Sequence, residues 1–283
     1  MSRNSKMYIT LTLAVSWIAT VLFYYMGKLN SMVILIMLFP AICAVIIRIK
    51  SKSSLRDMII NPKFKGLGSY IKAIIFAIIF PTVVIILCAI TGAIIYKVPL
   101  DSAFFKTIFN YQLYQYLLPK SFISMSIIFS FGEEYGWRGY LLPELMKRKS
   151  MTTSIFILGI VWALYHFPVL IFLNIDKLGA MESLKIGLIQ AGAAFVFSFG
   201  FAKCYLISNG LYPVVIMHTF WNLLNPFMLG SIYEGSPGLV LSEAPVEIIN
   251  GEGVLGIVFG GIFAIYMIIM AIRKKNNGQK ELV

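Results

Sequence analysis

Two adjacent carboxylates and an arginine interrupt an apolar stretch of this chain, in the sequence Phe131-Gly-Glu-Glu-Tyr-Gly-Trp-Arg138. On a helix, Glu133 and Glu134 point about 100° apart, and Arg138 lies one turn beyond Glu134 on the same face. We therefore expect Arg138 to pair with Glu134 as a structural brace. Glu133 would then be free to face a cavity and act as a general base. The alternative is a Glu-Glu-Arg network that only locks two helices together.

The chain has only two histidines, and both lie in apolar segments, Trp162-Ala-Leu-Tyr-His166 and His218-Thr-Phe-Trp-Asn222. A single buried histidine is more often a hydrogen-bonded core residue than a catalyst, but the pair favours a site. His218 and Asn222 lie one turn apart, so both can donate toward one point, as stabilisation of an oxyanion requires. His166 could share a water with Glu133. Trp162 would place its ring against His166, with core packing as its main role.

The elements that position these residues are predicted by composition. The 283 residues are 59% hydrophobic and only 13% charged, with a mean hydropathy of +0.85, whereas soluble domains carry roughly 25% charged residues. This composition predicts a polytopic membrane protein. The net charge of +12 comes mostly from short Lys and Arg clusters between apolar runs, which indicates membrane topology and not nucleic-acid binding. Cys43, Cys88 and Cys204 lie in apolar runs without metal-binding spacing, so we expect them to serve packing.

Apolar runs of about 20 residues, the length that crosses a bilayer as a helix, recur along the chain. They predict an all-α fold of about eight transmembrane helices, near 7–26, 32–47, 70–96, 117–146, 151–173, 183–207, 211–232 and 253–272. The site residues would then lie on facing helices of the bundle core. We divide the chain into N-terminal helices with a cytoplasmic loop (1–116), a core that carries the glutamate and histidine motifs (117–232) and an external loop with the last helix and a basic tail (233–283).

The charge of the loops predicts the orientation. One side would collect the basic residues near 3–6, 48–65, 147–149 and 273–280, whereas the loop 233–253 carries four Glu and no Lys or Arg. Because cytoplasmic loops are enriched in Lys and Arg, we expect both termini in the cytoplasm. The Glu-Glu pair precedes Lys147 by about three to four helical turns. We therefore expect the reactive cluster to open toward the cytoplasmic half of the bilayer.

These motifs, in this order on separate expected helices, resemble the CPBP family of CAAX proteases and bacteriocin-processing enzymes, also called the Abi family. That family includes the type II CAAX prenyl endopeptidase and lysostaphin-resistance-like proteins. The resemblance rests on Glu133-Glu134-x-x-x-Arg138, Trp162-x-x-x-His166 and His218-x-x-x-Asn222, within residues 117–232. The family commonly has Phe at the position of Trp162, and either residue keeps an aromatic wall.

The resemblance implies an intramembrane endopeptidase that hydrolyses a peptide bond with a water activated by Glu133 and His166. His218 and Asn222 would stabilise the oxyanion, and the Glu134–Arg138 pair would support the site. The substrate would be a peptide or protein, prenylated or membrane-embedded, and the role could be CAAX processing, bacteriocin maturation or self-immunity. Some members of the family act as scaffolds without proteolysis, and this alternative stays open.

Two further alternatives concern the metal and the reaction class. Glu133, His166 and His218 could form a three-ligand zinc site with an open position. The HExxH pattern of many zinc proteases is absent, however, and each histidine has a partner one turn away, so we favour a metal-free reaction. A transporter would also bury charged residues, but it would be expected to show inverted repeats. No second copy of the Glu-Glu motif occurs, so transport is the weakest interpretation.

Overall fold

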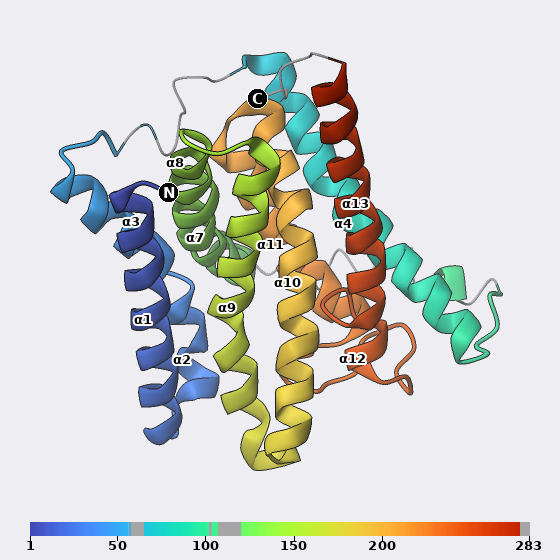
Figure 1. Cartoon of the computed structure of the whole chain (residues 1–283). Coiled ribbons are helices and arrows are strands. Elements are labelled where there is room, and N and C mark those ends of the chain that lie inside the picture. The colour runs from blue at the N-terminus through green and yellow to red at the C-terminus, as the bar shows by residue number, and fades with distance from the viewer. Residues whose placement is uncertain (56, 58–64, 102–103, 107–119, 278–283) are drawn as a thin grey trace.

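The computed structural model describes residues 1–55, 57, 65–101, 104–106 and 120–277, whose regular elements are helices arranged as a bundle (Figure 1). The helices that run along the bundle are α1 (Arg3–Tyr25), α2 (Leu29–Ile36), α3 (Phe39–Lys50), α4 (Leu67–Ile95), α7 (Lys120–Gly136), α9 (Met151–Leu178), α10 (Ala180–Ser208), α11 (Leu211–Leu229) and α13 (Val254–Asn276). Shorter pieces are the π-helical turn η2 (Trp137–Leu141), α8 (Leu142–Met146) and α12 (Val246–Ile249).

Six helical segments of the described residues are long and apolar enough to cross a membrane: Arg3–Tyr25, Leu29–Lys50, Leu67–Ile95, Met151–Leu178, Ala180–Ser208 and Val246–Asn276. The predicted all-α polytopic membrane fold is therefore confirmed, but the count of eight is not. The two remaining runs, 117–146 and 211–232, contain the buried ionisable residues Glu133, Glu134, Arg138 and His218, and the first run begins outside the described residues. The division of the chain at 116 and 232 stays a prediction.

The expected second span is interrupted. α2 ends at Ile36 and α3 begins at Phe39, with Pro40 in its first turn, where the missing N–H of proline is tolerated. The interruption leaves the carbonyl of Ile36 to accept a hydrogen bond from the Tyr165 hydroxyl at 2.9 Å. The broken segment is thereby fixed against α9, and both Ile36 and Met37 reach the wall of the central cavity.

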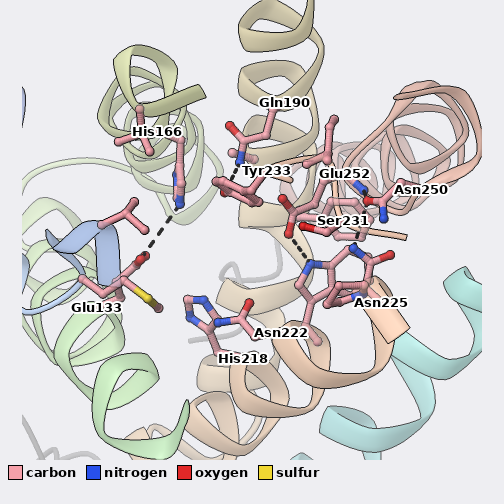
Figure 2. Close-up of a pocket in the computed structure, with 18 of the residues that line it drawn as sticks. Glu133, His166, Gln190, His218, Asn222, Asn225, Ser231, Tyr233, Asn250 and Glu252 are labelled. Carbon is pink, nitrogen blue, oxygen red and sulfur yellow. Dashed lines mark hydrogen bonds and ion pairs between the residues drawn. The ribbon is translucent and has the colours of Figure 1, made fainter. Parts of the chain in front are cut away.

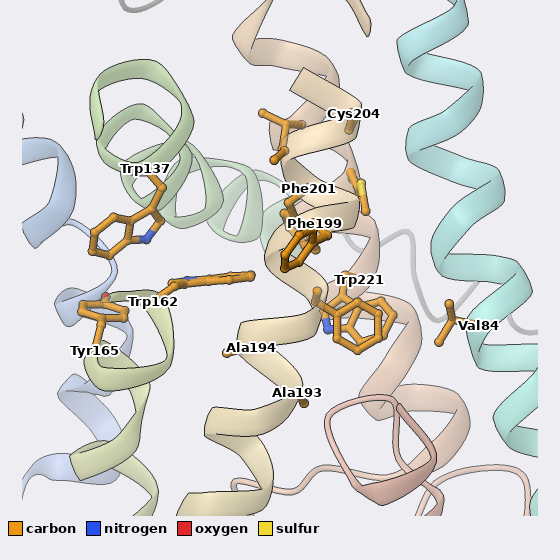
Figure 3. Close-up of a cluster of buried hydrophobic side chains, with 14 of the residues drawn as sticks. Val84, Trp137, Trp162, Tyr165, Ala193, Ala194, Phe199, Phe201, Cys204 and Trp221 are labelled. Carbon is orange, nitrogen blue, oxygen red and sulfur yellow. The ribbon is translucent and has the colours of Figure 1, made fainter. Parts of the chain in front are cut away.

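The helix that carries the two glutamates lies between α3 and α11, and α9 packs against α10 and α1. Large aromatic side chains fill the space between these helices, with Trp137, Trp162 and Tyr165 on one side of Figure 3 and Phe199, Phe201 and Trp221 further along. The turn η2 connects α7 to α8, and its five residues are all buried. Such π-helical turns occur frequently at functional sites.

Gly136 permits the close approach of α7 to α3. A Cβ added at Gly136 would lie 2.5 Å from the carbonyl carbon and from the Cβ of Pro40, and it would also collide with the Tyr8 hydroxyl. Pro40 offers backbone atoms there, which cannot rotate away as the end of a flexible side chain could. The position therefore requires glycine for packing reasons.

We expect Gly136→Ala to destabilise the protein by about 1–3 kcal/mol, the usual cost of overpacking a close-packed core. Gly68→Ala is the matched control, since Gly68 is also helical and nothing lies within 4 Å of an added Cβ. Both variants are compared by unfolding of the full chain in mixed detergent micelles. Equal midpoints for the two variants would contradict the packing argument.

Candidate active site

A buried ionic network joins α7, η2 and α11. Glu134 Oε1 accepts a hydrogen bond from Arg138 Nη1 at 2.9 Å and from His218 Nδ1 at 2.8 Å. Glu134 and Arg138 are completely buried, and His218 nearly so. The expected pair between Glu134 and Arg138 therefore forms, and His218 extends it from a helix that lies 84 positions further along the chain.

Two aromatic rings enclose the guanidinium of Arg138. Its Cζ lies 4.4 Å from the centre of the Trp162 ring and 4.9 Å from that of Phe201. A cation over the face of a desolvated aromatic ring gains about 2 kcal/mol or more. The rings from α9 and α10 thus replace part of the hydration that Arg138 loses.

Glu133 is oriented differently from its neighbour. Its Oε2 accepts hydrogen bonds from the indole N–H groups of Trp137 at 3.2 Å and Trp162 at 3.0 Å. Its Oε1 lies 3.9 Å from His166 Nε2, across the cavity shown in Figure 2. The two indoles thus hold one carboxylate oxygen and leave the other to face His166, as expected for a residue directed into a cavity.

Geometry also determines the tautomer of His166. Nδ1 lies 3.0 Å from the backbone carbonyl oxygen of Trp162, and a carbonyl can only accept, so Nδ1 carries the proton and donates. Nε2 is left to face Glu133. At 3.9 Å the two groups are too far apart for a direct hydrogen bond, but a single water can bond to both.

The four residues expected to be catalytic line one cavity of about 360 Å³: Glu133, His166, His218 and Asn222. His218 and Asn222 approach it from the same helix, α11 (Figure 2). The three supporting residues surround them: Glu134 and Arg138 behind His218, and Trp162 between the histidines, with ring centres 5.4 Å from His166 and 6.0 Å from His218. Trp162 packs as expected, and it also donates to Glu133.

The cavity extends away from the basic cluster at 147–149. Its far wall is formed by the loop after α11, including Ser231, Tyr233, Asn250 and Glu252. This loop lies at the opposite end of the bundle from α8 (Figure 1). The expectation that the site opens toward the basic cluster therefore differs from the structure. The reason is that the buried turn η2 fills the core between Glu133 and that cluster, whereas α11 ends at Leu229 and leaves room beyond it.

Several residues of the site were not expected from the sequence. Trp137 lies four residues after Glu133 and donates to it, which the spacing on a helix could have indicated. Phe201 packs its ring edge-on to His218, with centres 5.3 Å apart, but one phenylalanine in an apolar helix carries no signal of this. Gln190 in α10 was detectable as an uncharged polar residue in an otherwise apolar run.

The zinc alternative requires Glu133, His166 and His218 to converge on one point. Among the described residues, no group of three His, Cys, Asp or Glu side chains is arranged to hold a metal ion. These three residues therefore do not fit a three-ligand site in this conformation, and we derive no step through zinc.

The fold and the site define a class: a polytopic α-helical membrane protein with a buried glutamate and a partly buried histidine that face each other at a cavity. Residues 115–224 match the family described as Type II CAAX prenyl endopeptidase Rce1-like. The chain is 30% identical over 184 residues to the CAAX prenyl protease 2 of Methanococcus maripaludis, and the aligned part is 60% of this chain and 64% of that protein. Over this region, the chain is similar to the Rce1-like family. It spans just under two thirds of the length of this relative.

We expect Arg138→Met to destabilise the protein by about 3–5 kcal/mol, because removing one partner leaves the buried Glu134 uncompensated. Lys147→Met is the matched control. It removes the cation of the Glu144–Lys147 pair, whose lysine is exposed, and such surface pairs contribute at most about 1 kcal/mol. Unfolding in mixed micelles measures both. A loss at Arg138 no larger than that at Lys147 would show that the network does not stabilise the bundle.

Proposed function

We propose that this protein is an intramembrane endopeptidase, similar to CAAX prenyl proteases, that hydrolyses a peptide bond with a water held by Glu133 and His166. One observation carries the proposal: Glu133 Oε1 and His166 Nε2 face each other at 3.9 Å on a cavity that His218 and Asn222 also line. A general base, a water-orienting imidazole and two groups suited to an oxyanion are the parts that peptide hydrolysis needs. The similarity to the Rce1-like family supports this reaction class.

In the proposed reaction, Glu133 takes a proton from the water, and the oxygen attacks the carbonyl carbon of the substrate. The π electrons of the carbonyl move to its oxygen, which becomes an oxyanion facing His218 Nε2 and the Asn222 amide. When the tetrahedral intermediate collapses, Glu133 returns the proton to the leaving nitrogen and the C–N bond breaks. The products are a carboxylic acid and an amine, and Glu133 is regenerated.

The buried network supports the charge that this mechanism places on His218. Nδ1 of His218 already donates to Glu134, so Nε2 can donate to an oxyanion only when the ring is an imidazolium. Two ionised glutamates, Arg138 and a protonated His218 give a neutral cluster. This balance matters because an unpaired charge is costly in a dry interior.

We propose the metal-free form of this reaction. It is supported by the placement of Glu133, His166 and His218, since no group of three such side chains among the described residues is arranged to hold a metal ion. We further propose that both termini are cytoplasmic and that the substrate is a membrane-associated peptide or protein. A prenylated C-terminus, a bacteriocin precursor or a self-immunity target each fit. The second candidate function is a non-proteolytic scaffold of the same fold.

A quantitative survey of peptide termini tests the reaction. Membranes from cells that make the intact protein are compared with membranes from cells that make Glu133→Gln, which keeps the size of the side chain and removes the base. We expect new termini with the intact protein and a loss of about 10²–10⁴-fold in their formation with the variant, the usual contribution of a general base. Identical surveys with an unchanged cellular phenotype would favour the scaffold.

A matching experiment with chelator-treated membranes tests the metal: loss of the new termini, restored by added zinc, would overturn the metal-free form.

Asn222→Ala tests the proposed oxyanion site on the peptide that the survey identifies. Removing one preorganised donor costs about 10²–10³ in kcat, and we expect KM to change little because the group acts in the transition state. Thr219→Val is the matched control on α11. Thr219 is buried next to His218 but does not line the cavity, so kcat should stay within a few-fold of the parent. Equal kcat losses in both variants would indicate damage to the helix and not loss of a donor.

A further inference from the structure

The cavity has a second polar end that the proposed mechanism does not use. Gln190 of α10, Tyr233 of the loop after α11 and Glu252 before α13 line its wall on the side away from Glu133 and His166 (Figure 2). Gln190 Nε2 donates to the Tyr233 hydroxyl at 3.1 Å, and Trp221 Nε1 donates to Glu252 Oε1 at 2.9 Å. These side chains form one cluster, which we call the acceptor end.

The acceptor end has more acceptors than donors. Gln190 is 2% exposed, and its Oε1 has no hydrogen-bond partner among the described residues. Glu252 Oε2 is also buried, and the Tyr233 hydroxyl interacts with the same carboxylate. The Trp221 indole has donated its single N–H to Glu252 Oε1, and the N–H groups of the Gln190 amide cannot reach the oxygen of the same amide, so neither residue serves Gln190 Oε1. Buried acceptors without partners are rare in folded proteins, and an ordered water or a ligand completes them.

A hydrogen-bonded loop holds Glu252 in place. Asn250 Oδ1 accepts from the backbone N–H of Glu252 at 2.7 Å and from Asn225 Nδ2 at 2.9 Å. Asn225 Oδ1 accepts from the backbone N–H of Gly251 at 2.9 Å. These bonds fix the backbone at Gly251 and Glu252, and the Trp221 indole holds one oxygen of the carboxylate, so the Glu252 side chain is positioned as a binding group requires.

Charge identifies the kind of ligand. The residues that line the cavity include Glu133, Glu234 and Glu252 and no lysine or arginine, and the chain has none between Lys203 and Arg273. Burial raises the pKa of the Tyr233 hydroxyl well above its usual value, and the Glu252 charge adds to this effect, so Tyr233 stays neutral. A ligand that satisfies an anionic cluster of acceptors must bring positive charge and several N–H groups, and a primary ammonium has both.

We propose that Gln190 Oε1 and Glu252 Oε2 bind a primary ammonium of the substrate, either a lysine side chain or a free N-terminus, while the scissile bond lies at Glu133. The inference rests on the proposed function in taking the ligand to be the substrate. The same charge disfavours a C-terminal carboxylate at the acceptor end. Substrates would therefore be selected for a cationic group placed across the cavity from the site of hydrolysis.

Binding is tested without turnover, on the full-length Glu133→Gln protein in detergent, with hexylammonium, hexanol and hexanoate as probes. We expect hexylammonium to bind at least about tenfold more tightly than the other two, since a hydrogen bond to a charged group contributes enough for a factor of ten or more. Adding Glu252→Gln should remove most of that preference. Glu243→Gln is the matched control, because Glu243 is exposed on the same loop and does not line the cavity, and it should leave the preference unchanged.

Equal binding of the three probes, or a preference that survives Glu252→Gln, would overturn the proposal. If that variant does not fold, Gln190→Met removes the other acceptor at similar size and is expected to weaken the binding of hexylammonium alone.

Short apolar peptides then distinguish the two sources of the ammonium group. Replacing lysine by norleucine weakens binding if the lysine side chain is recognised, and N-acetylation weakens binding if the N-terminus is recognised. Because no step needs hydrolysis, a failure here leaves the protease proposal intact, and a failed survey of peptide termini leaves this result intact.

Discussion

The buried contact of Glu134 with Arg138 and His218 is the interaction on which the rest of the structure depends. Charges removed from water cost several kcal/mol each unless good geometry compensates them, and in a membrane protein no nearby water can relieve a poor fit. The contact therefore requires α7, η2 and α11 to lie in one arrangement, with Trp162 and Phe201 covering the guanidinium. The ionic contact therefore forms only when these helices are packed in this arrangement.

Because of this constraint, the two adjacent glutamates have different roles. Consecutive positions on a helix point in different directions, so the one that meets Arg138 cannot also reach the cavity. Glu134 becomes part of the interior, and Glu133 faces His166 with one oxygen held by two indoles. An identical pair of side chains thus acquires two roles from helical geometry: Glu134 is enclosed in the core, and Glu133 reaches the cavity.

The cavity itself has two chemically different ends. One has the histidines, Asn222 and Glu133, with a hydrogen bond fixing one nitrogen of each ring. The other is the acceptor end on the loop between α11 and α13, which is anionic and rich in acceptors. Apolar residues of α2, α9 and α10 lie between them. Such an arrangement suits an extended ligand that is anchored at one end and reacts at the other, which is how binding energy away from the reacting bond can contribute to catalysis.

The sequence by itself determined what depends on composition and on local helical spacing. Apolar runs of bilayer length predict helices, because a helix satisfies its backbone hydrogen bonds within the segment. The pairs Glu134–Arg138 and Trp162–His166 follow from positions four apart on one helix. Only the tertiary structure decided which helices face each other. The contact of His218 with Glu134, the indole of Trp162 on Glu133 and the direction of the cavity join segments far apart in the chain, and no local period encodes them. The acceptor end could not be predicted for the same reason: Gln190 stands out as a polar residue in its apolar run, but only the tertiary structure places it on the same cavity as Glu252.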